Sequence, residues 1–420
     1  MSIHSPAPSS TALLSGIRVL DLSRVLAGPL CGQYLGDMGA DVIKIEAPGE
    51  GDDTRSWPDF RASADGQRAS GPFLSANRNK RSLALDLKSE AGRAVVHGLA
   101  GSVDVVIESF APGVAARLGV DAQTLRNLNP RLIHCSISGF GSVGPMRHGK
   151  GYDLILQAFS GMLAITGEEG SPPTRSPFSP VDQGTGMHAL IGILAALLRR
   201  DRTGEGCSVE ASLFDTSAAF LGYFLQNHWF TGNEPRKVGV GHGSLCPYGV
   251  FEAADKPVIV GIANDALWRK FCTLAGLEDV INDPRYATNH ARVQNREDTE
   301  ALVGHALRQH KRGHWLALLD EAGIPCSPVH TLGEMSTHPH TEASGMLLRY
   351  EHPHFGSLKG IAQPLRFDGE RSAQRLPPPM VGEHSVEILR EAGCGEEQID
   401  ALLRQGVVTR QWEHDPSPAA

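Results

Sequence analysis

Arg18-Val-Leu-Asp-Leu22 and Asp41-Val-Ile-Lys-Ile-Glu46 decide the fold, because each is a short apolar run with the length of a β-strand. Between the two runs, the residues from Ala27 to about Met38 predict an apolar helix. Further strands are expected at 82–87, 104–108 and 131–138, with a helix at 90–99. Short apolar strands that alternate with helices indicate a parallel sheet with both faces covered. The first half therefore predicts an α/β fold with a Rossmann-like sheet, whose ligands bind beyond the carboxyl ends of the strands.

The second half has a different character. From about Ala219 to Pro247 the chain is rich in aromatic residues, glycine and polar residues. Tyr248-Gly-Val-Phe-Glu252 and Pro257-Val-Ile-Val-Gly-Ile262 then predict a hairpin, followed by helices at 265–275, 299–309 and 315–322. We expect a large α/β domain in 1–225 and a smaller α+β domain in 226–335. In 336–420 we expect a linker and a C-terminal arm that returns to the large domain, with helices at 385–392 and 396–405.

Composition limits the partners. The 420 residues are enough for two domains, and 41% hydrophobic and 20% charged residues are typical of globular proteins. The net charge of −8 provides no overall basic field for nucleic acid or an anionic membrane surface. Seven cysteines without a Cys-x-x-Cys pair indicate reduced thiols in a cytoplasmic protein. The polar start of the chain does not resemble a signal peptide, and the longest apolar run, 187–198, is short for a membrane span. We therefore expect no nucleic-acid or membrane partner.

One acid stands out in Ser179-Pro-Val-Asp-Gln-Gly-Thr-Gly-Met-His188, because Asp182 lies at the start of a long apolar helix. The positive partial charge and the unpaired N–H groups at a helix start favour an ionised carboxylate. Gly184 and Gly186 leave room for a ligand to approach the backbone. An exposed carboxylate in such a turn can attack an activated acyl group. The alternative is that Asp182 only caps the helix.

Basic residues recur in the loops that follow the predicted strands, namely Arg24, Arg55, Lys80, Arg81 and Arg117. Several of them could converge at the carboxyl edge of the sheet and hold phosphate groups, although each alone is compatible with a solvated surface charge. Gly139-Phe-Gly-Ser-Val-Gly144 matches the dinucleotide pattern, but Pro145 follows in place of the required helix. The loop is either a flexible turn or a glycine loop that lets Lys150 reach an anion.

Other catalytic patterns are missing. The sequence has no Gly-x-Ser-x-Gly nucleophile elbow and no ligand spacing typical of zinc, so we expect no metal. His242, His338 and His340 are predicted in loops without a matching acid pattern. His188 is interpreted as a satisfied core residue one turn into the apolar helix.

Taken together, these segments resemble the class III coenzyme A (CoA) transferase family, the CaiB/BaiF group that includes formyl-CoA transferase and carnitine CoA-transferase. The resemblance covers nearly the whole chain and includes the helix of Asp182. Its other segments are Gly16-Ile-Arg-Val-Leu-Asp-Leu-Ser-Arg-Val-Leu-Ala-Gly-Pro29, Gly39-Ala-Asp-Val-Ile-Lys-Ile-Glu46, Asn79-Lys-Arg-Ser-Leu83, Glu108-Ser-Phe-Ala-Pro-Gly113, Gly151-Tyr-Asp-Leu-Ile-Leu-Gln-Ala158, Arg202-Thr-Gly-Glu-Gly-Cys207 and Pro379-Met-Val-Gly-Glu-His384.

The resemblance implies that Asp182 is the catalytic nucleophile. Its carboxylate would attack an acyl-CoA thioester, and CoA would pass through an aspartyl anhydride and an aspartyl-CoA thioester to an acceptor acid. No cofactor is implied beyond the CoA thioester, which is a substrate. The same resemblance implies a set of CoA contacts, Arg24, Lys80, Ser109, Arg117, Lys150 and Asp153, although the role of Asp153 stays open between CoA contact, catalysis and structure.

Departures from the family pattern bear on the substrate. Formyl-CoA transferases have a glutamine where this chain has Leu26, and their glycine-rich loop is replaced here by Gly239-Val-Gly-His-Gly-Ser244. Both differences argue against a formyl-CoA and oxalate pair. His242-Gly-Ser-Leu-Cys-Pro-Tyr248 and Gly51-Asp-Asp-Thr-Arg55 look like members that move CoA among dicarboxylates such as succinate, glutarate, itaconate or mesaconate.

Three other functions are alternatives to CoA transfer. An α-methylacyl-CoA racemase has the same fold, but such enzymes carry a His-Asp pair where this chain has Tyr152-Asp153, and proton exchange needs two carriers. A non-catalytic acyl-CoA-binding homologue would not need Asp182. A nicotinamide oxidoreductase would need the helix that is missing after Gly144. The family also implies an interlocked homodimer in which each chain passes through a ring formed by the other.

Overall fold

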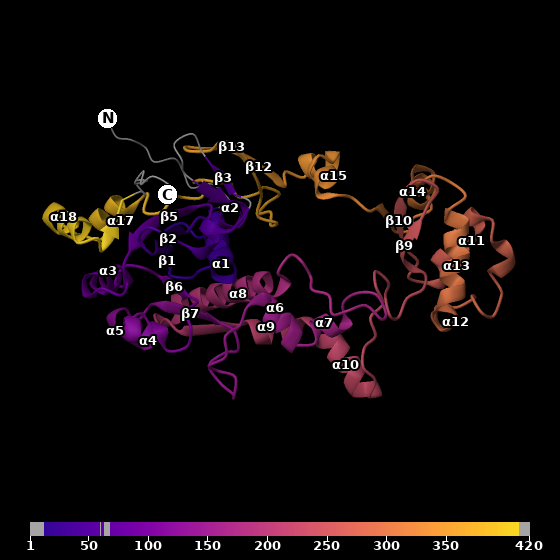
Figure 1. Cartoon of the computed structure of the whole chain (residues 1–420), viewed down its shortest axis with the longest axis horizontal. Coiled ribbons are helices and arrows are strands. Elements are labelled where there is room, and N and C mark those ends of the chain that lie inside the picture. Colours follow the sequence, from indigo (N-terminus) through magenta and orange to yellow (C-terminus); the bar gives the residue numbers. More distant parts are fainter. Residues whose placement is uncertain (1–11, 59, 63–67, 411–420) are drawn as a thin grey trace, which may run out of the picture. The chain divides into compact units, whose positions relative to one another are not determined.

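The computed structural model describes residues 12–58, 60–62 and 68–410. The described residues form two compact units (Figure 1). The larger unit lies within Met1–Ser160, Pro177–Phe220 and Pro339–Ala420, and the smaller unit comprises Gly161–Ser176 and Leu221–His338. The boundaries near 220 and 338 lie close to those expected at 225 and 335, but residues 161–176 join the smaller unit, which the sequence did not predict.

The larger unit is built on a seven-stranded sheet in the order β14-β5-β2-β1-β6-β7-β8. Its neighbouring strands are parallel except for β14, which pairs antiparallel with β5. The strands are β1 (Arg18–Asp21), β2 (Asp41–Glu46), β5 (Lys80–Leu85), β6 (Val105–Glu108), β7 (Ile133–Ser138), β8 (Ser208–Ser212) and β14 (Val408–Thr409). The predicted parallel α/β sheet is therefore present. Two strands, β8 and β14, join it without having been predicted, and β5 begins two residues before the expected strand.

Helices cover both faces of this sheet, because successive side chains of a strand point to opposite faces. On one face α1 packs against α8. On the other, Leu20, Ile43 and Leu83 belong to a hydrophobic core completed by side chains of α3, α5, α17 and α18. The helices of this unit are α1 (Ala27–Asp37), α2 (Gly71–Ala76), α3 (Glu90–Ala100), α4 (Val114–Leu118), α5 (Ala122–Leu128), α6 (Asp153–Phe159), α8 (Pro180–Thr203), α9 (Leu213–Phe220), α16 (Pro339–Ala343), α17 (Ser385–Glu391) and α18 (Glu396–Arg404), with a 3-10 turn η1 (Asp53–Ser56). The same unit holds two short antiparallel pairs, β3 (Phe60–Ala62) with β4 (Arg68–Ser70) and β12 (Leu347–His352) with β13 (Gly356–Ile361).

The smaller unit has its own core. Its three-stranded antiparallel sheet, in the order β11-β10-β9, packs Val258 and Val260 against Trp268 and Phe271 of α11. The predicted hairpin is therefore present as β9 and β10. The elements are β9 (Tyr248–Glu252), β10 (Pro257–Gly261), β11 (Cys326–Pro328), α7 (Met162–Ile165), α10 (Gly222–Thr231), α11 (Asp265–Ala275), η2 (Glu278–Val280), α12 (Asn289–Gln294), α13 (Arg296–Leu307), α14 (Arg312–Glu321) and α15 (Leu332–Ser336).

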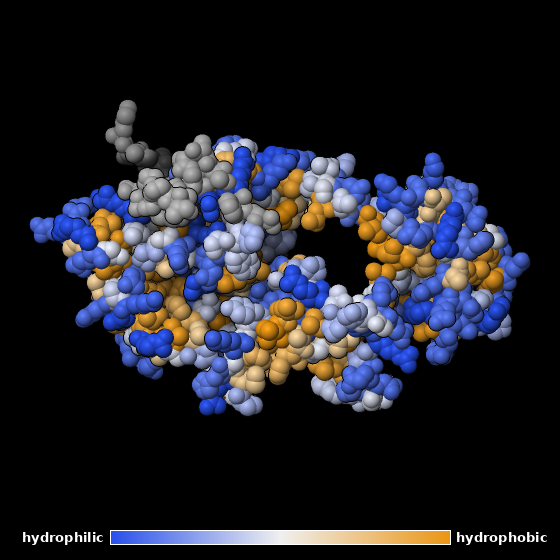
Figure 2. Space-filling view, in the orientation of Figure 1, coloured by the Kyte–Doolittle hydropathy of each residue, from blue (hydrophilic) through white to orange (hydrophobic). Residues whose placement is uncertain are grey.

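Helix α8 is the longest helix of the larger unit among the described residues. By length and composition its 24 residues could cross a membrane, and half of its most apolar stretch is buried within the fold. Core helices meet the same criterion, so the finding is weak support for a membrane span. Its first turns pack on α1 and α9, while Met187, Ile191 and Leu198 remain exposed. Elsewhere, Figure 2 shows orange apolar side chains scattered over a largely hydrophilic surface.

Candidate functional site: an acid pair and a basic pocket

Asp182 is the third residue of α8, and the position that caps the helix belongs to Ser179. Ser179 adopts a left-handed conformation, with φ of 52°, and its side chain makes no capping hydrogen bond. Among the described residues, no first-turn N–H group donates to the Asp182 carboxylate. The interpretation of Asp182 as a helix cap is therefore wrong, and its carboxylate is not used to hold the helix.

Asp153, the first residue of α6, takes that role. Its Oδ2 accepts hydrogen bonds from the backbone N–H of Val181 at 2.8 Å and of Asp182 at 3.2 Å. Gln157, one turn further along α6, donates to the other oxygen of the same carboxylate. A carboxylate at a helix start pairs with the free N–H groups and with the positive end of the helix dipole. Asp153 thus occupies the place that the sequence suggested for Asp182.

The two carboxylates affect each other. Burial, and then the negative charge of Asp153, raise the pKa of Asp182 from an ordinary 3.8 to about 7. The sequence predicted an exposed carboxylate ionised by the helix start; instead Asp182 is half-buried, and the first-turn amides are occupied by Asp153. At neutral pH this carboxylate exists in both protonation states, and it is far more basic than an ordinary aspartate.

Gly184 and Gly186 serve packing in this structure. A Cβ atom at Gly184 would lie 2.3 Å from the ring of Phe220, and one at Gly186 would lie 2.5 Å from the carbonyl oxygen of Ala27. Both glycines are buried and let α8 approach α9 and α1 closely. The expectation that they leave room for a ligand is wrong for these two positions.

A pocket of about 810 Å³ lies at the carboxyl ends of β1, β2 and β5 and beside α4. This is the size of a cofactor site, at the edge where parallel sheets bind ligands. The predicted residues Arg24 and Arg117 line it together with Phe110, and we call it the basic pocket. The Ser109 hydroxyl accepts a hydrogen bond from the backbone N–H of Arg24 at 3.0 Å, so three predicted CoA contacts gather here.

Lys88 was missed by the sequence analysis. It also lines this pocket, just beyond β5, and its side chain is exposed. The signal was available, because Lys88 follows a predicted strand as Arg24 does. What the sequence could not show is that the carboxyl ends of β1 and β5 open into the same pocket.

Three other predicted basic residues, Lys80, Arg55 and Arg81, do not line this pocket. Lys80 is fully buried under α1, where its ammonium donates to Asp21 Oδ2 at 2.9 Å, to the Pro29 carbonyl and to Asn77. All three protons of the ammonium are thereby used. The expected contact of Lys80 with CoA is therefore wrong for this structure. Likewise, the Arg55 guanidinium binds Glu46, and Arg81 pairs with carboxylates of β2 and α17.

Lys150 and His188 are both exposed. Lys150 lies at the end of the 139–151 loop, whose two ends are held together, since a Cβ at Gly139 would lie 2.7 Å from the backbone nitrogen of Gly151. Lys150 does not line the basic pocket. His188 is satisfied as expected, since it shares a 2.9 Å hydrogen bond with Thr216 Oγ1. Its expected place in the core is wrong, because the residue is exposed.

A second pocket of about 590 Å³ in the larger unit borders the first turn of α8 at Ser179 and Gln183. Its wall includes Leu26, the residue that departs from the formyl-CoA transferase pattern, and Val25, whose φ is 72°. A β-branched residue in the left-handed region is strained. The Asp52 carboxylate holds this turn by accepting a hydrogen bond from the Val25 N–H at 3.3 Å. No sequence pattern marks that strain.

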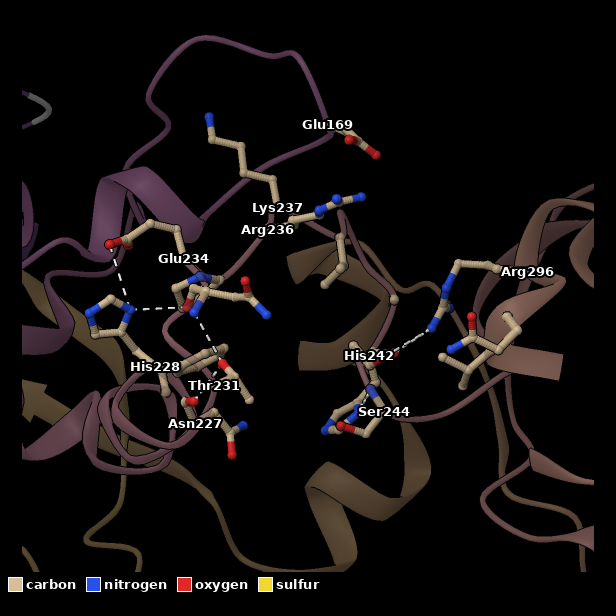
Figure 3. Close-up of a pocket in the computed structure, with 18 of the residues that line it drawn as sticks. Glu169, Asn227, His228, Thr231, Glu234, Arg236, Lys237, His242, Ser244 and Arg296 are labelled. Atoms are coloured by element: carbon tan, nitrogen blue, oxygen red, sulfur yellow. Dashed lines mark hydrogen bonds and ion pairs between the residues drawn. The ribbon is translucent and has the colours of Figure 1, made fainter. Parts of the chain in front are cut away.

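The smaller unit has a pocket of about 720 Å³ between α10 and the segment around 236–244 (Figure 3). The segment that resembles the dicarboxylate-specific members forms part of its wall. The Arg296 guanidinium fixes that segment by donating to the carbonyl oxygens of His242 at 2.9 Å and Leu245 at 3.1 Å. On the other side of the pocket, His228 lies 3.6 Å from Glu234. Within the described part of the chain, no group of three or more His, Cys, Asp or Glu residues is placed to hold a metal ion.

A parallel α/β sheet with cations at its strand ends, and a basic carboxylate in the same unit, defines a protein suited to a phosphate-bearing substrate and to chemistry at an acidic side chain. Relatives of known activity are CoA-transferases. The chain is 39% identical to an acyl-CoA transferase of Fusarium pseudograminearum, over 96% of this chain and 90% of the relative. It is 38% identical to a succinate–glutarate CoA-transferase of Agrobacterium fabrum, over 91% and 96% of the two chains.

A crystal structure of a CaiB/BaiF family protein from Brucella suis is similar to this one, with a TM-score of 0.81 and 37% identity. The match covers 90% of this chain and 99% of that chain. The family model of CoA-transferase family III matches residues 14–385. The chain therefore belongs to CoA-transferase family III.

Proposed function

We propose that this protein transfers CoA from an acyl-CoA, such as succinyl-CoA, to a dicarboxylic acid, with Asp182 as the nucleophile. The observation that carries the proposal is the state of Asp182. Burial and the charge of Asp153 raise its pKa to about 7, and no cation pairs with its carboxylate among the described residues. A basic carboxylate that is free of a counterion is a good nucleophile toward a thioester carbonyl.

The proposed cycle has four balanced steps. The Asp182 carboxylate attacks the thioester carbonyl, the carbon–sulfur bond breaks, and a mixed anhydride and CoA thiolate form. The thiolate attacks the Asp182 carbonyl, so the donor acid leaves and an aspartyl-CoA thioester remains. The acceptor carboxylate then attacks that thioester, which gives a second anhydride and the thiolate. Finally the thiolate attacks the acceptor carbonyl, which releases the new acyl-CoA and restores Asp182. Because the thioester's energy is conserved, we propose that no cofactor takes part.

The basic pocket suits the nucleotide end of CoA. Arg24, Lys88 and Arg117 line it, and a guanidinium or ammonium binds phosphate oxygens through charge-assisted hydrogen bonds. We propose that Lys150, exposed at the end of its pinned loop, adds a further contact to CoA. Asp153 is not proposed as a CoA contact, because its carboxylate already accepts hydrogen bonds from α8 and Gln157.

The acceptor is proposed to be a dicarboxylate such as glutarate. The relative from Agrobacterium fabrum is named for succinate and glutarate. The apolar pocket beside the first turn of α8 carries Leu26 in place of an amide side chain, which suits the methylene chain of a longer diacid better than oxalate.

We also propose that the enzyme works in the cytoplasm as a homodimer. Met187, Ile191 and Leu198 lie along one face of α8 and are each between 43% and 63% exposed. Exposed apolar stripes of this kind mark protein interfaces, so a second copy of the chain is expected to contact α8. Light scattering of the purified protein tests this proposal, and a monomer at micromolar concentration would contradict it.

A mass-spectrometric exchange assay tests the proposed function. The purified protein is incubated with succinyl-CoA and a pool of acids (oxalate, glutarate, itaconate and mesaconate), and every new acyl-CoA is recorded. We expect glutaryl-CoA or a related dicarboxylyl-CoA, and no product with Asp182→Ala. Asp201→Asn, which changes an exposed acid on the same helix, is the matched control and should retain full exchange. Deuterium uptake into a 2-methylacyl-CoA without exchange would instead indicate a racemase.

A further inference from the structure

The carboxylates of Asp153 and Asp182 meet at the start of α8, and only that of Asp153 accepts hydrogen bonds from the first-turn N–H groups. Asp153 reaches across from α6 and accepts the N–H groups of Val181 and Asp182, while Gln157 fixes its other oxygen. Asp153 is 8% exposed, so its charge is little screened by water. The backbone that carries Asp182 is therefore bonded directly to the neighbouring acid.

We propose that Asp153 is the positioning residue of the nucleophile: by occupying the first-turn amides of α8 with its own charge, it fixes the backbone of Asp182 and denies the Asp182 carboxylate the stabilisation of the helix start. The inference rests on the proposed function, because it assigns a role for Asp153 in the attack by Asp182. It places Asp153 in the enzyme as a group that touches neither CoA nor the acyl group.

The physical argument concerns basicity. An acid alone at a helix start would accept the free amides and interact with the dipole, which lowers its pKa and weakens it as a nucleophile. Asp153 takes both favourable interactions. Asp182 is left with burial and a neighbouring negative charge, both of which raise its pKa. A more basic carboxylate forms its bond to a thioester carbonyl more readily.

Ionisable groups on the elements packed against α8 have partners of their own; on β7, for example, His134 shares a hydrogen bond with the Val120 carbonyl. On α8 itself His188 bonds Thr216, and on α9 Asp215 accepts a hydrogen bond from the Ser212 hydroxyl. On β8 Glu210 accepts from the Ser142 hydroxyl. On α1 the only acid is Asp37, which is paired with Arg78. Next to Asp153, Tyr152 is largely exposed. Asp153 is the one group whose charge raises the pKa of Asp182.

Two substitutions separate charge from geometry. Asp153→Asn keeps an oxygen that can accept from the Val181 and Asp182 amides but removes the charge. We expect the rising limb of kcat/KM against pH, near pH 7 in the wild type, to move down by about one pH unit, with KM for the acyl-CoA unchanged. Asp153→Ala removes the hydrogen bonds as well, and we expect kcat to fall about 10²-fold because the nucleophile is no longer held in place.

The matched control is Asp121→Asn. Asp121 accepts two first-turn amides of its own helix, α5, as Asp153 accepts two of the neighbouring helix α8. The Asp121→Asn variant should leave the rising limb of the pH profile at the wild-type position. The proposal would be overturned if Asp153→Asn also left the limb there while keeping the melting temperature and oligomeric state of the wild type.

An activity-independent readout keeps the inference testable if a variant does not fold or the protein exchanges no CoA. Aspartate labelled with ¹³C at the carboxyl carbon is incorporated into the wild type, and the Asp182 signal is assigned by its loss in Asp182→Asn. A wild-type Asp182 that titrates below about pH 5 overturns the inference, because the helix start then stabilises its charge. A wild type that exchanges no CoA while Asp182 titrates near pH 7 refutes the proposed function and leaves the effect of Asp153 on Asp182 standing.

Discussion

Two groups of buried acids in the larger unit are treated in opposite ways by the fold. In the first, which we call the paired-charge cluster, Asp21, Glu46 and Asp52 face Lys80, Arg55 and Lys44. In the second, the acid pair, Asp182 faces Asp153 and, among the residues that the structure describes, no cation. Burial acts to raise the pKa of Asp52, but the charge of Lys44 and hydrogen bonds lower this pKa to about 2. The pKa of Asp182 is about 7.

The difference separates charges that hold the fold from the charge to which we assign chemistry in the proposed function. Removing a partner from a buried ion pair leaves an uncompensated charge, so the paired-charge cluster is committed to stability. An acid placed beside another acid destabilises the fold and gains reactivity, which is a usual compromise at active sites.

Asp182→Asn should abolish CoA exchange, with a loss of about 10³-fold or more in kcat, because the amide is not a nucleophile. The exchange assay measures this loss directly. Asp201→Asn on the same helix should stay at the wild-type rate. An Asp182→Asn variant that retained a tenth of the activity would show that the acid pair is not the reactive centre.

Lys80→Met should destabilise the protein by about 3–5 kcal/mol, because it leaves Asp21 buried and short of its cation. Urea unfolding followed by circular dichroism measures the change. The control is Arg349→Met, which breaks an exposed pair with Glu342 and should leave the midpoint unchanged. If Lys80→Met instead raised only KM for the acyl-CoA, the paired-charge cluster would be part of the binding site after all.

Asp182→Asn should at the same time stabilise the fold at pH 8, on the order of 2 kcal/mol. With a pKa of 3.8 in the unfolded chain and about 7 in the folded one, Asp182 binds its proton more tightly when folded. Stability therefore falls as pH rises between these values, and the full penalty is present at pH 8. The gain should shrink toward pH 5 in parallel urea titrations. A destabilised variant at pH 8 would mean that Asp182 has a favourable partner.

Arg117→Ala should raise KM for the acyl-CoA about tenfold with a smaller change in kcat, because one charge-assisted phosphate contact is lost. The sharper test uses an acyl-pantetheine substrate, which lacks the nucleotide phosphates. With that substrate the variant and the wild type should have the same KM. Equal effects on both substrates would place Arg117 outside the nucleotide end of the site.

Much of the fold of the two units could be predicted from the sequence. The alternation of apolar runs predicts β1, α1, β2, the later strands β5, β6, β7, β9 and β10, and longer helices such as α3, α8 and α11, since the period of hydrophobic residues depends on local structure. It also places Arg24 and Arg117 at the carboxyl edge of the sheet. It misses short elements such as α2, α4 and α12. The sequence does not predict elements that exist only through pairing with a distant strand, such as β14, whose two residues join the sheet through β5.

The sequence singles out the acid at the start of α8, but the surroundings it predicts for that acid are wrong. Asp182 was identified at a helix start, yet Asp153, 29 residues earlier, takes the amides that were assigned to it. Similarly, the need for glycine at position 186 comes from its contact with Ala27, and the buried position of Lys80 depends on its ion pair with Asp21. A sequence gives the chemistry of each side chain, but whether a charge is free or neutralised depends on which distant residue the fold brings to it.

The pairing of β14 with β5 has a consequence for how the chain is made. The sheet edge at β5 is completed by residues 408 and 409, which leave the ribosome after the whole smaller unit has been synthesised. Until then the backbone groups of β5 along that edge lack their partner strand, and such edges recruit other chains. A protein shortened by a premature stop just before Val408 should therefore be an aggregating species in the cell rather than a weaker enzyme.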